Sequence, residues 1–156
     1  MSGIRSVCVV GAGAIGSLFA GHLASVVETK LLVRRKEHAA TDPAQLEPVD
    51  LIIVATKASA VAAAAKHLSG HFPGTTVMTV QNGLGCEDVI AQHGDWPVIS
   101  SITFMSGIRH SDVEVEYELD TETWMGPWSK GSADFAVTRA AAELIVSSGL
   151  RAKAIE

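Results

Sequence analysis

Cysteines, cations and long apolar runs are scarce in this sequence. It has only two cysteines, Cys8 and Cys86, which are too few for a disulfide framework. Its 12 lysines and arginines are outnumbered by 17 acidic residues, and the net charge of −5 argues against a nucleic-acid or membrane surface. No apolar run reaches the ~18 residues that span a bilayer, and we expect no signal peptide ahead of the first apolar segment. We therefore expect a cytoplasmic protein with neither nucleic acid nor a membrane as partner.

Apolar content is high, at 47% of the 156 residues, and it predicts one compact domain covering 1–156. Continuous apolar runs alternate with helical stretches, which is typical of an α/β fold with a buried parallel sheet. The predicted fold is Rossmann-like, doubly wound and mainly parallel. We expect strands at 7–10, 29–33, 51–55, 75–80, 98–104 and 123–126, and helices at 15–25, 58–68 and 135–148, the last ending before Gly149.

A glycine-rich turn directly follows the first apolar run and precedes the first helix. Gly11 permits a tight turn, Gly13 lets the backbone approach a pyrophosphate, and Gly16 lets the helix pack close to the strand. The helix N-terminus offers free N–H groups and the positive end of its dipole to phosphates. This context disfavours the alternative, a turn that binds nothing. The predicted cofactor-binding residues here are Gly11, Ala12, Gly13, Ala14, Ile15 and Gly16.

The second predicted strand ends on three cations, Arg34, Arg35 and Lys36. NAD-selective folds place an acidic residue about 20 residues past the glycines, whereas an arginine there accommodates a 2′-phosphate. The planar guanidinium suits phosphate recognition, and Glu37 follows too late to be the usual ribose partner. We therefore predict an NADP(H) site that includes Arg34 and Arg35. The alternative is a solvated basic loop.

The connection that follows, residues 36–49, is short for a doubly wound fold. Another strand and crossover normally stand here, and we expect that outer strand to be absent. The segment 41–46 predicts a single capped helical turn, with Pro43 at a favoured first position.

Polar clusters close two of the predicted parallel strands. Thr56 and Lys57 follow the run 51–55, and the segment 81–83 follows the run 75–80. Open α/β sheets bind ligands at the carboxyl ends of their strands. Both clusters are therefore predicted to share one ligand edge with the glycine turn.

Other polar residues carry no predicted site. The segment 113–122 alternates with period two and places five carboxylates on one solvated strand face. His67 and His71 are four apart, but a glycine and a proline interrupt the helix that would align them, so no metal site is predicted. Cys86 begins a helix, a position that can lower a thiol pKa, but with no base predicted beside it we assign it no nucleophilic role.

The ordered motifs at 11–16, 55–58 (Ala-Thr-Lys-Ala) and 81–85 (Gln-Asn-Gly-Leu-Gly) resemble the N-terminal domain of the ketopantoate reductase (2-dehydropantoate 2-reductase) family. That family reduces ketopantoate, a 2-oxo acid, with NADPH. The resemblance implies that the three glycines hold the pyrophosphate and that Arg34 holds the 2′-phosphate. It places Lys57 and Asn82 beside the nicotinamide half of the cofactor, with Asn82 also adjacent to substrate.

The resemblance also implies what these 156 residues do not supply. Family members take the general-acid lysine and most substrate contacts from a helical C-terminal domain, which we expect to be absent here, so no catalytic residue is assigned. The apolar face that such a domain covers then predicts a homodimer or a separate helical domain as partner. The alternative function is a non-catalytic NADP(H)-binding module or truncated paralogue.

Overall fold

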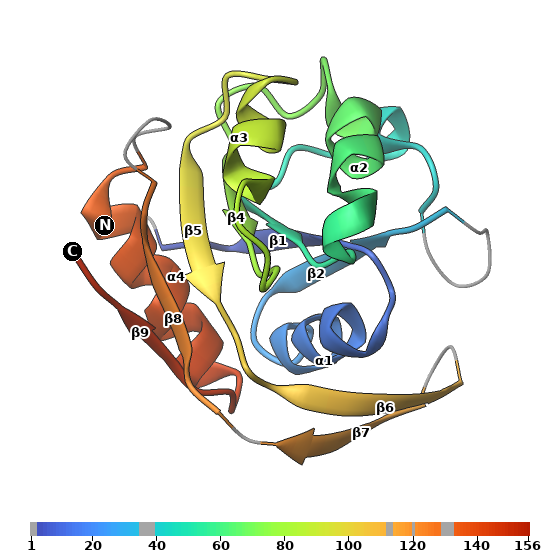
Figure 1. Ribbon diagram of the computed structural model, residues 1–156, viewed down its shortest axis with the longest axis vertical. Helices are drawn as coiled ribbons and strands as arrows, with labels where there is room; N and C mark the ends of the chain where they lie inside the picture. Colours follow the sequence, from blue (N-terminus) through green and yellow to red (C-terminus); the bar gives the residue numbers. More distant parts are fainter. Residues whose placement is uncertain (1–2, 35–39, 112–113, 120, 129–132) are drawn as a thin grey trace.

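The computed structural model describes residues 3–34, 40–111, 114–119, 121–128 and 133–156. A seven-stranded sheet forms its centre, in the order β2-β1-β3-β4-β5-β8-β9 (Figure 1). The strands from β2 to β5 are parallel, β8 is antiparallel to β5, and β9 is parallel to β8. The predicted α/β, mainly parallel, Rossmann-like fold is thus confirmed. The strands are β1 (Ser6–Val10), β2 (Glu28–Leu32), β3 (Leu51–Val54), β4 (Thr76–Thr79), β5 (Val98–Ile102), β8 (Thr123–Pro127) and β9 (Ala152–Ala154).

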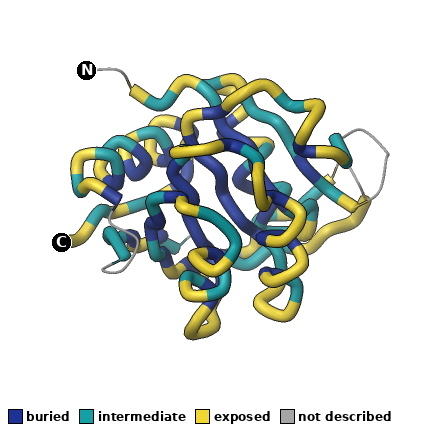
Figure 2. Tube along the Cα trace, turned by 90° about the horizontal axis from the view of Figure 1, so that it is seen from above, coloured by how far each residue is buried: buried dark blue, intermediate teal, exposed yellow. Residues whose placement is uncertain are grey.

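Helices cover both faces of the sheet, as a doubly wound fold requires (Figure 1). In β1, Val7 and Val9 pack in the core cluster that holds α1 and α4, while Cys8 and Val10 pack in the cluster that holds α2 and α3. Buried residues therefore run along the central strands, and exposed residues lie on the loops (Figure 2). The helices are α1 (Ala14–Leu23), α2 (Val61–Leu68), α3 (Cys86–Ala91) and α4 (Phe135–Ser147), with 3-10 turns η1 (Pro43–Gln45) and η2 (Ala58–Ala60). None of the described helices is long and apolar enough to cross a membrane.

After β2, the described chain resumes at Ala40, which pairs with Leu32 through an isolated backbone bridge. Ala40 donates to the carbonyl of Leu31 at 3.0 Å, and Val33 donates to the carbonyl of Ala40 at 2.9 Å. Asp42 then caps η1 by accepting from the amide of Ala44 at 2.9 Å. In the part of the chain that the structure describes, no further strand lies beyond β2. The predicted capped turn is confirmed. Of the connection predicted to lack an outer strand, residues 40–49 form no strand beyond the bridge at Ala40, and 36–39 lie outside the described residues.

A separate hairpin, β6 (Ser106–Ser111) with β7 (Glu114–Leu119), packs over α1 (Figure 1). A Cβ added to Gly107 would lie 3.0 Å from Leu18 Cδ1, so the hairpin and the helix are in close contact. The alternation predicted for β7 is present, because its described glutamates are exposed while Val115 and Tyr117 are half-buried. Asp120 of the predicted acidic row lies outside the described residues.

Candidate functional site

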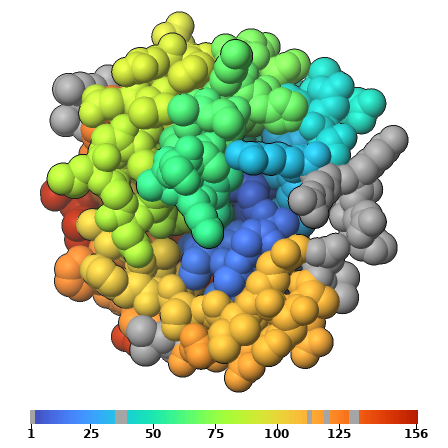
Figure 3. All heavy atoms as spheres, turned by 45° about the vertical axis from the view of Figure 1, so that its right-hand side comes forward, coloured from blue at the N-terminus to red at the C-terminus, as the bar shows by residue number. Residues whose placement is uncertain are grey.

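The carboxyl ends of the parallel strands bring the predicted site segments to one edge. The sheet order places them side by side: Arg34 after β2, the glycine turn after β1, Lys57 after β3 and Asn82 after β4. In Figure 3 the blue atoms of the N-terminal segment are visible at the surface, between green atoms above and the orange atoms of the hairpin region below. The structure thus brings these residues to the ligand edge that the sequence predicts.

Gly11 and Gly16 are positions where a side chain has no room. Gly11 has a φ of +103°, and a Cβ there would lie 3.1 Å from the backbone nitrogen of Thr56. A Cβ on Gly16 would overlap the carbonyl oxygen of Gly11 and lie 3.4 Å from Ala55 Cβ. Turn, helix and the end of β3 therefore pack backbone to backbone, the close approach that the glycine pattern predicts.

Gly13 differs from its two neighbours in the pattern, because a Cβ there would meet nothing within 4 Å. It is the N-cap residue of α1, no side chain caps the helix there, and the first turn holds no acidic residue. The first amides of an α-helix have no partner within the helix and carry the positive end of its dipole. The space beside Gly13 is therefore open, positively polarised and suited to an anion.

Arg34 lies two residues past the end of β2, and it is exposed. Gly11 donates its amide hydrogen to the carbonyl of Leu32 at 3.0 Å, which fixes the end of β2 next to the glycine turn. Arg34 and the open N-terminus of α1 thus follow two neighbouring strands, β2 and β1. Arg35, the second predicted cation of the site, lies outside the described residues.

Gln81 is a buried polar residue at this edge. The sequence placed it in the motif 81–85 but predicted no role for it. The residue is 8% exposed, and its Nε2 donates to the carbonyl of Val54 at 2.7 Å and to that of Thr56 at 2.9 Å. The exposed residues Lys57 and Asn82 flank these contacts. Two further buried atoms, Thr56 Oγ1 and Gln81 Oε1, have no hydrogen-bond partner in the described chain.

The two thiols are buried and poorly ionisable. Burial raises the pKa of Cys8 to about 12, and the residue packs in the core as predicted. The pKa of Cys86 is also raised, first by burial and then by the neighbouring carboxylate of Glu87. A helix start can lower a thiol pKa, but at Cys86 desolvation and a like charge outweigh the end of this short helix.

We expect slow alkylation of both cysteines in the folded chain. A raised pKa leaves little thiolate, the reactive form, so the iodoacetamide rate should still rise with pH up to pH 9. Mass spectrometry of the labelled peptides measures each site, and the urea-unfolded chain is the control with fast labelling at both. Rapid labelling of Cys86 at pH 7 in the folded chain would contradict this.

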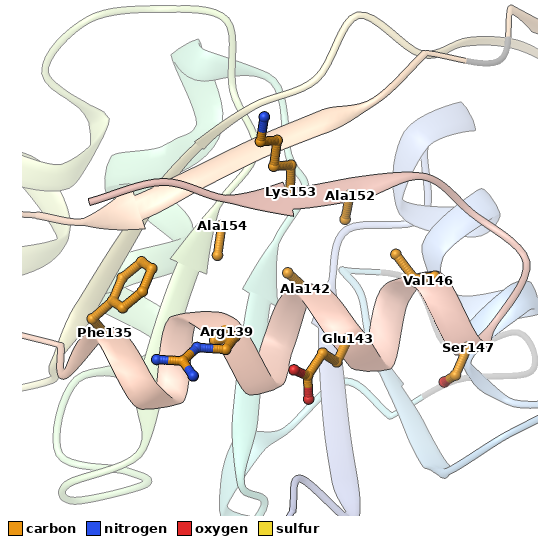
Figure 4. A pocket seen from close by; sticks show the side chains of 9 residues that line it. All are labelled: Phe135, Arg139, Ala142, Glu143, Val146, Ser147, Ala152, Lys153 and Ala154. Carbon is orange, nitrogen blue, oxygen red and sulfur yellow. The ribbon is translucent and has the colours of Figure 1, made fainter.

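Elsewhere among the described residues we find no second candidate site for a cofactor or metal. No group of three His, Cys, Asp or Glu side chains among the described residues is arranged to hold a metal ion. An open groove of about 540 Å³ lies between α4 and β9 at the far edge of the sheet, away from the glycine turn (Figure 4). Ala152 and Ala154 face α4 across it, while the amino group of Lys153 points away from that helix. The groove contains none of the predicted cofactor-binding residues.

A family model described as Ketopantoate reductase PanE/ApbA matches residues 33–130. The chain belongs to the ketopantoate reductase family. Its relatives include the 2-dehydropantoate 2-reductase of Pyrococcus abyssi, which is 30% identical over 148 residues, 81% of this chain and 49% of the relative. The chain thus spans about half the length of the curated relatives that it matches.

Solved ketopantoate reductases share the fold of this family member. A PanE/ApbA family ketopantoate reductase from Ralstonia eutropha JMP134 superposes with a TM-score of 0.82 at 19% identity, covering 97% of this chain and 57% of that one. A D-mandelate dehydrogenase, solved with NADH and anilino(oxo)acetate, gives a TM-score of 0.83 at 22% identity, with coverages of 97% and 57%. At these identities the likeness establishes the fold.

Proposed function

We propose that residues 1–156 form the NADP(H)-binding domain of a ketopantoate-reductase-like oxidoreductase that reduces a 2-oxo acid. The observation that carries the proposal is the open helix N-terminus at Gly13, next to β2, whose carboxyl end is followed by Arg34. An anion fits the first feature and a 2′-phosphate fits the second. The family membership supports the reaction class.

The residues at the edge fit the two halves of a dinucleotide. Residues 11–16 would hold the pyrophosphate, and Arg34, which follows β2, would pair with the 2′-phosphate of the adenosine half. The ends of β3 and β4 would hold the nicotinamide half, because these strands lie on the opposite side of β1 from β2. Lys57 and Asn82 follow those strands, and Asn82 offers an amide to the substrate. The cofactor, when bound, supplies the hydride.

The proposal assigns the binding of the cofactor to this chain, but not the proton transfer to the substrate. We assign no general acid among the described residues, although a positioned acid typically contributes ~10²–10⁴-fold to such a reaction. Ketopantoate is the proposed substrate because curated relatives are named 2-dehydropantoate 2-reductases. A homodimer or a separate helical domain is the proposed partner. Exposed Ile102 and Trp124, which are paired across β5 and β8, supply an apolar patch for it.

Titration of the chain with NADPH and with NADH, followed by energy transfer from tryptophan, tests the cofactor assignment. The expected result is saturable binding that prefers NADPH. Adding ketopantoate and following NADPH consumption then tests the reaction. Binding without turnover favours the non-catalytic module over the complete reductase, and failure to bind either nucleotide contradicts the proposal as a whole.

A further inference from the structure

We propose that Gln81 is a positioning residue that holds the nicotinamide-side loops of the site in their binding geometry. This inference rests on the proposed function and identifies a device within the same site. It is carried by the two hydrogen bonds of the buried Gln81 amide and by the place of their acceptors in the sheet.

The amide of Gln81 continues the connection between two strands past the end of their ladder. The paired register of β3 and β4 ends at Val54 and Thr79. Beyond that point no ladder pairs the two segments, and Gln81 Nε2 links them by donating to the carbonyls of Val54 and Thr56. Because Gln81 is only 8% exposed, water competes little for these acceptors. The side chain thus substitutes for the missing ladder bonds.

The bridged segment is fixed on its other side by the glycine turn. Ala55 donates to the carbonyl of Val10 at 2.8 Å, and Gly11 approaches Thr56 so closely that only a glycine fits there. Thr56 is therefore held by backbone contact with β1 on one side and by Gln81 on the other. Removing the amide of Gln81 leaves the backbone contacts with β1 intact and removes the hydrogen bonds on the β4 side.

The released loops are those that carry Lys57 and Asn82. The apparent affinity of a site falls in proportion to the fraction of molecules in the competent geometry. Because β3 and β4 lie across β1 from Arg34, the loss should fall on the nicotinamide half of the cofactor. Adenosine 2′,5′-bisphosphate, which reaches only toward β2, should bind as before.

The test compares Gln81→Met with the wild-type chain, using calorimetric titration of NADPH and of adenosine 2′,5′-bisphosphate. Thr123→Val is the matched control, since it also removes a buried hydrogen bond, from Thr123 Oγ1 to Thr103 Oγ1, but in β8 away from the glycine turn. We expect Gln81→Met to weaken NADPH about tenfold, as for a fall to about a tenth in the competent fraction, and to leave the fragment within about twofold. Thr123→Val should lower the unfolding midpoint and alter neither affinity.

Three results would overturn the inference. Equal losses of NADPH and fragment in Gln81→Met would mean a general loosening of the fold, and unchanged NADPH affinity would mean that the bridge is dispensable. Absence of NADPH binding by the wild-type chain would contradict the proposed function as well as this inference, which distinguishes it from the two results above. If Gln81→Met does not fold, Gln81→Asn keeps the amide on a shorter side chain and should show a smaller loss confined to NADPH.

Discussion

Gly16→Ala is expected to destabilise the fold by at least about 3 kcal/mol and to abolish nucleotide binding. The new Cβ would overlap the carbonyl oxygen of Gly11 and lie 3.0 Å from its carbonyl carbon. Backbone atoms cannot rotate away as the end of a flexible side chain can, so α1 must move off β1. Urea unfolding measures the stability, and NADPH titration of the folded fraction measures the binding.

Gly21→Ala is the matched control, because it makes the same substitution in the same helix. A Cβ at Gly21 meets nothing within 4 Å, and the residue is exposed. Alanine there should stabilise α1 by about 0.5–1 kcal/mol through its lower backbone entropy. If both variants were equally stable, the close approach at Gly16 would not be a constraint on this fold.

Arg34→Ala is expected to weaken NADPH roughly 30-fold while changing NADH by less than about threefold. The two nucleotides differ only in the 2′-phosphate, and a charge-assisted guanidinium–phosphate contact accounts for a difference of that size. Parallel titrations of each variant with both nucleotides give the ratio directly. An equal loss for NADPH and NADH would remove Arg34 from the 2′-phosphate site.

Lys30→Ala controls for the general loss of positive charge on β2. Lys30 is a cation on the same strand, and its Nζ lies 3.1 Å from Glu28 Oε1 on the surface. Its removal lowers the charge as Arg34→Ala does, but not at the strand's carboxyl end. The NADPH-to-NADH ratio should therefore match that of the wild-type chain.

Features that depend on neighbouring residues were predictable from the sequence. The glycine turn, the buried strand 51–55 and the capped start of η1 at Asp42 all depend on local conformational preference or apolar runs, which a sequence displays directly. The end of α4 at Gly149, with a φ of +96°, belongs to the same class. For such features the local preference and the final fold agree.

Features that depend on distant partners were not predictable. β6 went unpredicted because four of its six residues are exposed and no alternation marks it as a strand. The three residues of β9 are too few to show a period. Gln81 forms hydrogen bonds with carbonyls that precede it by 27 and 25 positions in the chain, a separation that no local pattern reveals. The raised pKa of Cys86 comes first from its burial, which also depends on the fold.

The position of the β6–β7 hairpin over α1 has a consequence for biosynthesis. During translation β1, α1 and β2 leave the ribosome early, yet the outer face of α1 stays exposed to solvent until the hairpin has been synthesised. The last support comes later still, when His22 Nδ1 donates to the carbonyl of Ser148 at 2.9 Å. Helix α1 is thus the first of the described helices to be synthesised and among the last to be enclosed. A nascent chain stalled before residue 106 exposes it to chaperones and proteases.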